Sequence, residues 1–396
     1  MMLHKPRLLL LVGLVTVAAF LLGACGGDDP TATPTPTRAP SAATPTPTVA
    51  MTAFEVEWEE LKTAAQEEGE LILYLCCGMG GAIDPLIPEM EQILGIKIIN
   101  STGSARDRAS KDLAEREAGK ISMDVQSAAG STTPSTILMP AGVIRELKSL
   151  LIHPEVLDDS IWYGGDLTWM DPDRLLLAYG AQPSNSTVNF NTDLVDPAEI
   201  TSVWDLLEPE WRGKIVMRDP RLGGSSGSVV NFYMQEDVGP EFLQLLFEYN
   251  VFAPDVRTAV EWLATGKYAI CMFACSRELR GARLQGLPVE ERFPHPLEDA
   301  TISVGGSSLF AYDGAPHPNA QKLFVNWWLT REGQAFMQRI DGNNSLRTDI
   351  SKADVFPENR IPEGVDFIFR NRLPNAREIE EESLAWVVAT LAEMGR

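Results

Sequence analysis

The sequence predicts an α/β fold with two lobes, each a mixed but mainly parallel sheet flanked by helices, joined by a two-strand hinge. Short apolar runs typical of buried strands alternate with helical spacings that end at glycines. This alternation occurs twice along the chain. About 340 residues remain after a polar N-terminal stretch, which is more than a single hydrophobic core usually supports, so two lobes are expected.

The first lobe is expected over residues 53–183. Its opening helix places Trp58, Leu61, Ala64 and Ala65 on one face and stops at Gly69. Strands are predicted at 71–77, 96–100 and 123–127, with a helix at 83–94 and a polar helix that ends near Gly119. Such alternation implies a parallel sheet whose ligands gather at the carboxyl ends of its strands.

The second lobe is expected over residues 184–302, after a crossover at Gln182, Pro183 and Ser184 that lies between strands at 175–179 and 187–190. Within it the pattern predicts strands at 214–217 and 268–273 and helices at 226–236 and 240–249. Residues 303–345 return to the first lobe, and residues 346–396 form a C-terminal segment expected to pack on the second lobe.

The N-terminal residues have the layout of a bacterial export signal. A charged start with Lys5 and Arg7 precedes an apolar run from residue 8 to 22, and Gly23, Ala24 and Cys25 follow in the order of a lipoprotein cleavage site. We therefore expect residues 1–24 to be a signal peptide and Cys25 to carry the lipid anchor. An ordinary export signal with a chance cysteine is the alternative. Residues 25–52 alternate Pro and Thr, which predicts an extended spacer.

The charge excludes one class of partner. Removing residues 1–24 takes away Lys5 and Arg7 and no acidic residue, which moves the formal net charge from −22 to −24. Phosphate-backbone binding needs clustered Lys and Arg, so a nucleic-acid partner is not expected. No later apolar run reaches transmembrane length. The prediction is a soluble domain outside the cytoplasm, held at the outer face of the cell membrane by its lipid alone.

Four stretches resemble the type 2 periplasmic-binding superfamily, and within it the extracellular solute-binding proteins grouped with ferric-iron, thiamine and phosphonate or sugar-phosphate binders. They are AAQEEGELILY at 64–74, WDLLEPEWRGKIVMRDP at 204–220, EWLATGKYAI at 261–270 and HPNAQKLFVNWWLTREGQ at 317–334. The resemblance implies a monomeric subunit of an ATP-binding-cassette importer. Such a subunit would hold a small molecule between its lobes, pass it to a permease and its ATPase, and need no cofactor or catalysis.

Small and basic residues near the predicted strand ends are the candidate ligand contacts. The loop at 219–227 is rich in Gly and Ser and precedes a helix, whose positive end would favour an anion. An ordinary loop with Ser226 as the helix N-cap is the alternative. Arginine suits carboxylate or phosphate, although a surface salt bridge is its commoner role. The full set is Cys77, Gly78, Met79, Ser101, Thr102, Ser104, Arg106, Ser127, Arg218, Ser225, Ser226, Ser276, Arg277 and Arg347.

The iron-binding residues of the resembled family are replaced in this chain. Relatives place adjacent tyrosines where Cys275, Ser276 and Arg277 stand, and a histidine where Cys77 and Gly78 stand. A hard cation prefers oxygen ligands, so no direct metal site is predicted. The ligand options left open are ferric iron or its chelate, phosphonate, sugar phosphate, thiamine and dicarboxylate. Cys76, Cys77, Cys271 and Cys275 fit buried structural cysteines, one disulfide or ligand contacts.

Two other functions are compatible with the sequence. A sensor could use the same fold to present its ligand state to a membrane kinase. A serine hydrolase is suggested by Gly223, Ser225 and Gly227, which match the G-x-S-x-G pattern, with His295 and His317 later in the chain. The pattern is common in Gly/Ser loops, so the non-enzymatic reading is preferred.

Overall fold

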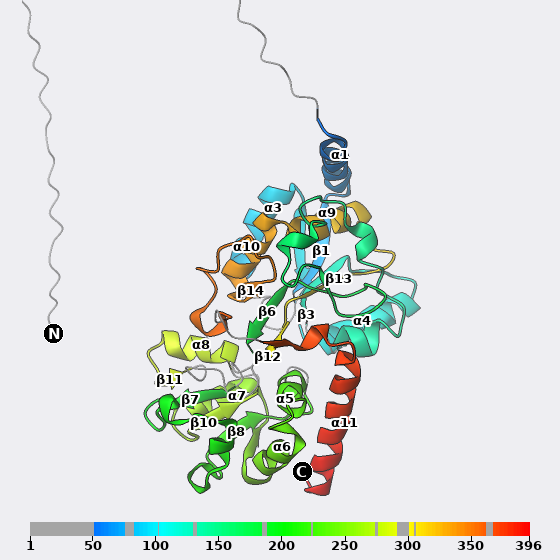
Figure 1. Ribbon diagram of the computed structural model, residues 1–396. Helices are drawn as coiled ribbons and strands as arrows, with labels where there is room; N and C mark the ends of the chain where they lie inside the picture. Colours follow the sequence, from blue (N-terminus) through cyan, green and yellow to red (C-terminus); the bar gives the residue numbers. More distant parts are fainter. Residues whose placement is uncertain are drawn as a thin grey trace, which may run out of the picture. The chain divides into compact units, whose positions relative to one another are not determined.

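The computed structural model describes residues 51–75, 83–101, 103–129, 133–183, 188–222, 225–273, 276–290, 301–304, 306–361 and 367–396 (Figure 1). The α-helices are α1 Ala53–Glu68, α3 Ile87–Leu94, α4 Ala105–Glu117, α5 Ser225–Tyr233, α6 Gly239–Tyr249, α7 Val256–Ala264, α8 Ser276–Leu284, α9 Pro318–Leu329, α10 Arg331–Asp341 and α11 Ala376–Glu393. The short helices are η1 Asp84–Leu86, η2 Pro134–Leu138, η3 Lys148–Leu150, η4 Asp159–Ile161, η6 Pro197–Glu199, η7 Val203–Leu207, η8 Pro209–Trp211, η9 Pro357–Asn359 and η10 Arg370–Arg372.

Helix α1 shows how local sequence sets an element's ends. Thr52 and Glu55 form a capping box, in which each side chain accepts a hydrogen bond from the other's backbone N–H, at 3.2 Å for the Thr52 hydroxyl and 2.6 Å for the Glu55 carboxylate. The helix ends at Gly69, whose φ of +82° is a left-handed conformation that suits glycine. The predicted stop at Gly69 is confirmed.

The first sheet has the order β2-β1-β3-β13-β5-β4. Its strands are β1 Glu70–Leu75, β2 Lys97–Ser101, β3 Val125–Ala129, β4 Thr168–Trp169, β5 Leu177–Ala178 and β13 Ser308–Ala311. β1 pairs in parallel with β2 and β3, while β13, β5 and β4 continue the sheet in antiparallel pairs. The predicted strand at 71–77 is β1, which begins one residue earlier and ends at Leu75; Cys76 and Cys77 lie outside the described residues.

The second sheet has the order β11-β7-β10-β8-β9. Its strands are β7 Val188–Asn191, β8 Ile215–Arg218, β9 Val251–Ala253, β10 Ile270–Met272 and β11 Val289–Glu290. β8 runs parallel to β9 and β10, and β7 pairs antiparallel with β10 and β11. Both sheets are therefore mixed, and their parallel strands are connected through helices. The predicted α/β class is confirmed.

A third, small sheet contains the crossovers and has the order β14-β6-β12-β15. Its strands are β6 Gly180–Pro183, β12 Thr301–Ser303, β14 Asn344–Ser345 and β15 Ile368–Phe369. The outgoing strand β6 and the returning strand β12 pair antiparallel, with Ile302 opposite Pro183. These are the two extended connections that the sequence predicts, and β14 and β15 flank them.

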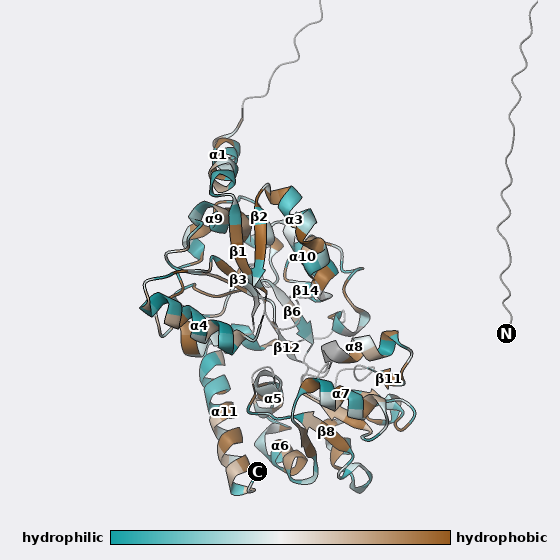
Figure 2. Ribbon diagram, turned by 180° about the vertical axis from the view of Figure 1, so that it is seen from behind, coloured by the Kyte–Doolittle hydropathy of each residue, from teal (hydrophilic) through white to brown (hydrophobic). Residues whose placement is uncertain are grey.

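Separate hydrophobic cores accompany the two larger sheets. The first core holds Leu73, Val125, Leu309 and the α9 residues Phe324 and Trp328. A second core gathers around β7, β8 and β10, with Phe190, Ile215 and Ile270 fully buried. Figure 2 shows hydrophobic colouring along β1, β2 and β8 and hydrophilic residues along α4. Further clusters lie around Tyr74 and Phe310 on the first sheet and around Val216 and Cys271 on the second, so each larger sheet has its own buried residues, as the two-lobed prediction requires.

The C-terminal segment contributes to both cores rather than to the second alone. Leu346 and Phe369 are buried in the first core, whereas Val387 and Leu391 of α11 are buried in the second. α11 lies alongside α5 (Figures 1 and 2). The segment therefore passes from one core to the other at residues 369–376.

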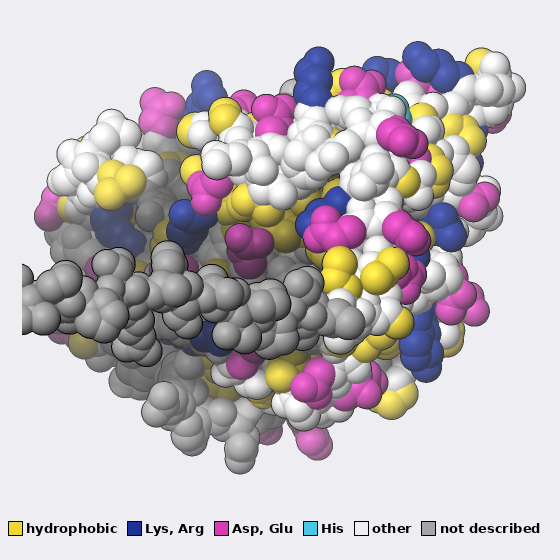
Figure 3. Space-filling view, turned by 90° about the horizontal axis from the view of Figure 1, so that it is seen from above, with side chains coloured by type: hydrophobic (Ala, Val, Ile, Leu, Met, Phe, Trp, Pro, Cys, Tyr) yellow, Lys and Arg dark blue, Asp and Glu magenta, His cyan; other side chains and the backbone are white. Residues whose placement is uncertain are grey.

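The surface matches the acidic composition. Acidic and basic side chains are interspersed over the face seen in Figure 3. Within the part of the chain that the structure describes, no helix is both long enough and apolar enough to cross a bilayer.

Candidate functional site

Two candidate residues of the first lobe lie at the carboxyl edge of its parallel strands, on either side of β1. β1 lies between β2 and β3, with Ser101 opposite Tyr74 and Ser127 opposite Leu75. Ser127 is fully buried, and its hydroxyl lies 3.0 Å from the Tyr179 hydroxyl. The structure thus brings Ser101 and Ser127 to the edge where an α/β sheet usually carries its ligand.

The loop after β2 supplies the N-cap residue of α4. The Ser104 hydroxyl accepts a hydrogen bond from the Asp107 N–H at 3.2 Å and donates one to the Asp107 carboxylate at 2.6 Å. Tyr74 donates to the Gly103 carbonyl at 3.0 Å. Arg106 is exposed in the first turn of α4. Ser104 therefore acts as a helix cap in this structure, and Thr102 lies outside the described residues.

The candidates of the second lobe follow β8 and β10, two parallel strands that end at the same edge. Half-buried Arg218 is the last residue of β8, Ser225 begins α5, and Ser276 begins α8 with Arg277 next to it. The strand pairing places the ends of β8 and β10 at one edge of the sheet, and Ser225, Ser276 and Arg277 follow these ends in the chain. Cys25, Cys77, Gly78 and Met79 lie outside the described residues.

The start of α5 is buried. Ser225 has no exposed surface and Ser226 is 5% exposed. The Ser226 N–H donates to the Leu222 carbonyl at 3.1 Å, whereas the Ser225 hydroxyl makes no hydrogen bond within the described chain. A buried hydroxyl without a partner is uncommon, because the lost hydration is not compensated. This end of α5 thus has an unused polar group beside the positive end of the helix dipole.

Arg221, just before α5, is already paired with Asp219. Its Nε and Nη2 contact the Asp219 carboxylate at 2.9 and 2.6 Å, and the guanidinium holds the pKa of Asp219 below its usual value. Arg221 also donates to the Arg396 carbonyl at 3.3 Å. These contacts stabilise the turn after β8.

Sequence reasoning did not single out Arg370, which contacts the first turns of α5 from the C-terminal segment. Its Nη1 donates to the Gly227 carbonyl at 2.5 Å and to the Asn231 Oδ1 at 3.1 Å. Arg370 is 5% exposed. No local sequence pattern could reveal these contacts with α5, because they join residues 139 or more positions apart.

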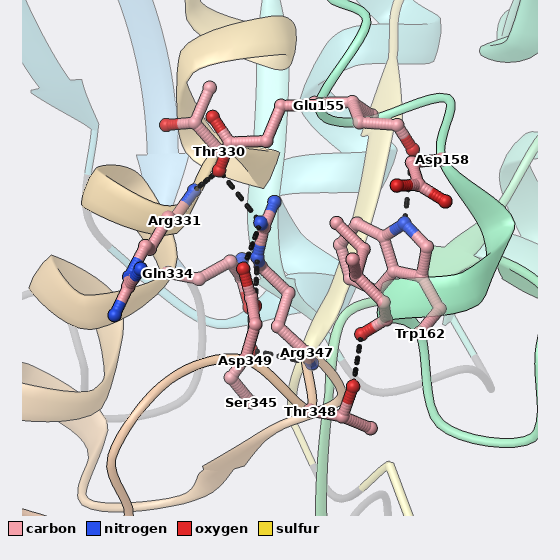
Figure 4. Close-up of polar contacts among 12 residues, drawn as sticks. Glu155, Asp158, Trp162, Thr330, Arg331, Gln334, Ser345, Arg347, Thr348 and Asp349 are labelled. Carbon is pink, nitrogen blue, oxygen red and sulfur yellow. Dashed lines mark hydrogen bonds and ion pairs between the residues drawn. The ribbon is translucent and has the colours of Figure 1, made fainter.

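Arg347, also a candidate, lies in a different place. Its side chain is fully buried and pairs with Asp349 through Nε at 2.9 Å and Nη2 at 2.7 Å (Figure 4). Nη2 also lies 2.7 Å from a Glu155 carboxylate oxygen, and Nη1 donates to the Leu329 carbonyl at 3.1 Å. The pairing lowers the pKa of Asp349. Arg347 therefore ties the turn that holds Glu155, the end of α9 and the C-terminal segment together and does not join the other candidates.

No described histidine is hydrogen-bonded to the Ser225 hydroxyl. His317 precedes α9, with its Nδ1 2.9 Å from a carboxylate oxygen of buried Asp124, whose pKa burial raises. The backbone N–H of His317 also donates to Asp124, at 2.9 Å. The histidine is thus engaged within the first lobe, and no hydrogen bond joins it to the Ser225 hydroxyl. His295 lies outside the described residues.

Of the five cysteines, Cys271 lies in the described part of the chain. Cys271, buried in β10 between β7 and β8, is disulfide-bonded. The other four cysteines lie outside the described residues. Across the described ranges, no three His, Cys, Asp or Glu side chains gather closely enough to hold a metal ion.

Comparison with known proteins identifies the fold. No family model and no curated protein matches the chain. Iron-bound HitA from Pseudomonas aeruginosa is 18% identical with a TM-score of 0.60, covering 81% of this chain and 99% of its own. The periplasmic binding protein AfuA from Actinobacillus pleuropneumoniae, with fructose-6-phosphate bound, is 16% identical with a TM-score of 0.60, covering 81% and 98%.

A third solved structure, described as a two-component system protein that mediates signal transduction, is 18% identical with a TM-score of 0.58, covering 79% of this chain and 99% of its own. At these identities the likeness shows the fold. The chain has the fold of the periplasmic binding proteins, which is the fold that the resemblance implies.

Proposed function

We propose that the protein is the solute-binding component of an ATP-binding-cassette importer, held outside the cytoplasmic membrane by a lipid on Cys25. The observation that best supports this proposal is that two sheets, each with its own buried residues, are joined through the paired strands β6 and β12. Opening and closing about such connections lets two lobes enclose a ligand, and a permease can then recognise the closed form.

The proposed ligand is a small anion or an anionic chelate. Ser101 and Ser127 stand at the carboxyl edge of one sheet, and Arg218, Ser225, Ser226, Ser276 and Arg277 follow the corresponding edge of the other. The positive helix end and the guanidinium groups favour negative charge. Arg106 and the groups at 77–79 and 102 remain in the proposal from the sequence alone, whereas the ion pairs of Arg347 argue for a structural role.

Two solved structures with this fold contain bound ligands. One carries iron and another fructose 6-phosphate. This chain lacks the adjacent tyrosines that ferric binders use, so a phosphate ester fits its candidate residues better than bare ferric ion.

A thermal-shift screen tests the proposal. The chain from residue 25 onward, with Cys25→Ser to prevent lipidation, would be unfolded alone and with inorganic phosphate, fructose 6-phosphate, a phosphonate, a dicarboxylate, thiamine or ferric citrate. A true ligand at 100 times its Kd adds about 2.7 kcal/mol to the free energy of unfolding. Small-angle scattering should show contraction with the same compound. No shift with any anion would contradict anion capture.

A sensor that reports a bound ligand is the second candidate, because a solved structure with this fold is described as a two-component system protein. Uptake and signalling can be separated in cells that lack the gene. The importer function predicts loss of uptake of the labelled ligand. Unchanged uptake with an altered transcriptional response to the ligand would favour the sensor.

A further inference from the structure

Arg370 carries a charge that its surroundings do not neutralise. No described carboxylate forms an ion pair with it, and its two hydrogen-bond acceptors, the Gly227 carbonyl and the Asn231 amide oxygen, are neutral. Burial lowers its pKa, with a partial opposing effect from the charge of Glu380. Arginine nevertheless stays protonated at neutral pH. A buried cation without a counterion is costly, so its retention points to a partner that is anionic.

One edge of the guanidinium is unused. Nη1 donates both of these hydrogen bonds, while Nε and Nη2 donate to no residue in the described chain. The residue as a whole keeps 5% of its surface exposed. Parallel Nε and Nη2 donors form the fork that binds carboxylate or phosphate in bidentate fashion.

The position of the guanidinium links it to the proposed anion site. Gly227 is the third residue of α5 and Asn231 lies one turn later, so Arg370 flanks the first two turns of the helix. The buried, unpartnered Ser225 hydroxyl begins the same helix. The Gly227 and Asn231 acceptors follow Ser225 by two and six residues, so the guanidinium lies along the helix that Ser225 begins, and a buried charge is only weakly screened.

We propose that Arg370 is a specificity-determining residue of the solute site, where it selects the dianionic form of a phosphate monoester bound at the start of α5. This inference rests on the proposed function and extends it to a ligand class. It adds a residue from the C-terminal segment to a site that otherwise comes from strand ends of the two lobes.

The neighbouring Arg372 provides a matched control. It lies two residues along the same short helix, but it faces the first lobe, where its Nε donates to the Thr168 hydroxyl at 3.1 Å and its Nη2 to the Asp166 carbonyl at 2.9 Å. Replacing either arginine by glutamine removes one positive charge from η10. Only Arg370→Gln removes it from α5.

The experiment measures fructose 6-phosphate and inorganic phosphate affinity by calorimetry at pH 5 to 8, using the chain from residue 25 with Cys25→Ser. Because a phosphate monoester loses its second proton near pH 6, wild-type affinity for fructose 6-phosphate should rise through that pH. Arg370→Gln should weaken binding at pH 8 about tenfold to hundredfold and flatten the pH dependence. Arg372→Gln should stay within about threefold of wild type with its pH dependence intact.

Several results would overturn the inference. Wild-type-like affinity in Arg370→Gln would do so, as would equal losses in the two variants, which would indicate a general effect of η10. If Arg370→Gln does not fold, Arg370→Lys is the test, because it keeps the positive charge and loses the Nε/Nη2 fork. This variant should bind fructose 6-phosphate more weakly and retain the pH dependence of binding. Loss of that pH dependence would refute the role of Arg370 in selecting the dianion. If the wild type binds neither phosphate, the phosphate-monoester inference is refuted, whereas anion capture is contradicted only if the wider thermal-shift screen also finds no anion.

Discussion

Arg347→Met should destabilise the first lobe by about 3 kcal/mol, because it removes the central cation of a buried network. The guanidinium contacts two carboxylates and the Leu329 carbonyl. Glu155 and Asp349 are 36% and 32% exposed, so both carboxylates regain hydration when the cation is lost. Their share of the loss must therefore be discounted to about 1 kcal/mol.

The larger share comes from groups that cannot regain hydration. The Leu329 carbonyl loses its donor at the end of α9, which costs about 1–3 kcal/mol. The cation also lies over the Trp162 ring, 5.6 Å from its centroid, which adds about 0.5–1 kcal/mol. Methionine fills most of the vacated space, so a large cavity cost is not expected.

Hydrogen exchange measured by mass spectrometry suits this test, because two cores need not unfold together. Peptides covering 155–163 and 344–350 should exchange faster by the factor that about 3 kcal/mol implies, roughly 150-fold. Peptides from α6 should not change. Arg106→Met is the control, since it removes an exposed arginine and should alter stability by less than about 0.5 kcal/mol. A change below about 1 kcal/mol in Arg347→Met would refute the assigned role.

Four further predictions concern stability and association. Burial lowers the pKa of Lys352 to about 8. The folded state therefore binds fewer protons than the unfolded state between about pH 8 and 10.5. Urea titration should show that the free energy of unfolding rises across this window in wild type relative to Lys352→Met. Gly164→Ala should cost about 2 kcal/mol in the same assay, because Gly164 has φ +77° and an added Cβ would lie 1.9 Å from the Arg372 Nη1. Ser104→Ala should lower the unfolding free energy by about 1 kcal/mol through loss of the α4 cap, and an unchanged value would show that Asp107 or solvent replaces it. If the protein binds phosphate esters, added salt should raise the association rate in stopped-flow measurements, because the net charge of −22 repels them; a falling rate would show that local positive charge dominates the approach.

Elements with a long local pattern were predictable from the sequence. The β1–β2–β3 strands and the helices between them follow from apolar runs and from stops such as Gly69 and Gly95, each of which adopts positive φ. Strands of two residues, such as β14 and β15, were not predicted, because their pairing with β6 and β12 depends on chain segments far away in the sequence.

The candidate site was predictable by location and less so by role. Ser101, Ser127 and Arg218 could be placed because strand ends are visible in the sequence, and parallel strands share an edge. Arg347 looked equally suited to an anion, yet its carboxylate partner Glu155 lies 192 positions earlier, a contact that no local pattern reveals. Arg370 was overlooked for the same reason.

An acidic protein that captures an anion must separate its overall charge from its local charge. The net charge of −22 is spread over a surface where both signs intermix (Figure 3), and in 0.1 M salt such exposed charges act over about 10 Å. Buried charges are screened less, so one guanidinium without an ion-pair partner in the described chain, beside Gly227 and Asn231 of α5, can outweigh many distant carboxylates. Most of the interior arginines are neutralised, as Arg108 is by Asp112 and Arg347 by Asp349. Arg370 has only neutral acceptors within the described chain, and this difference makes it the residue on which anion recognition can be tested.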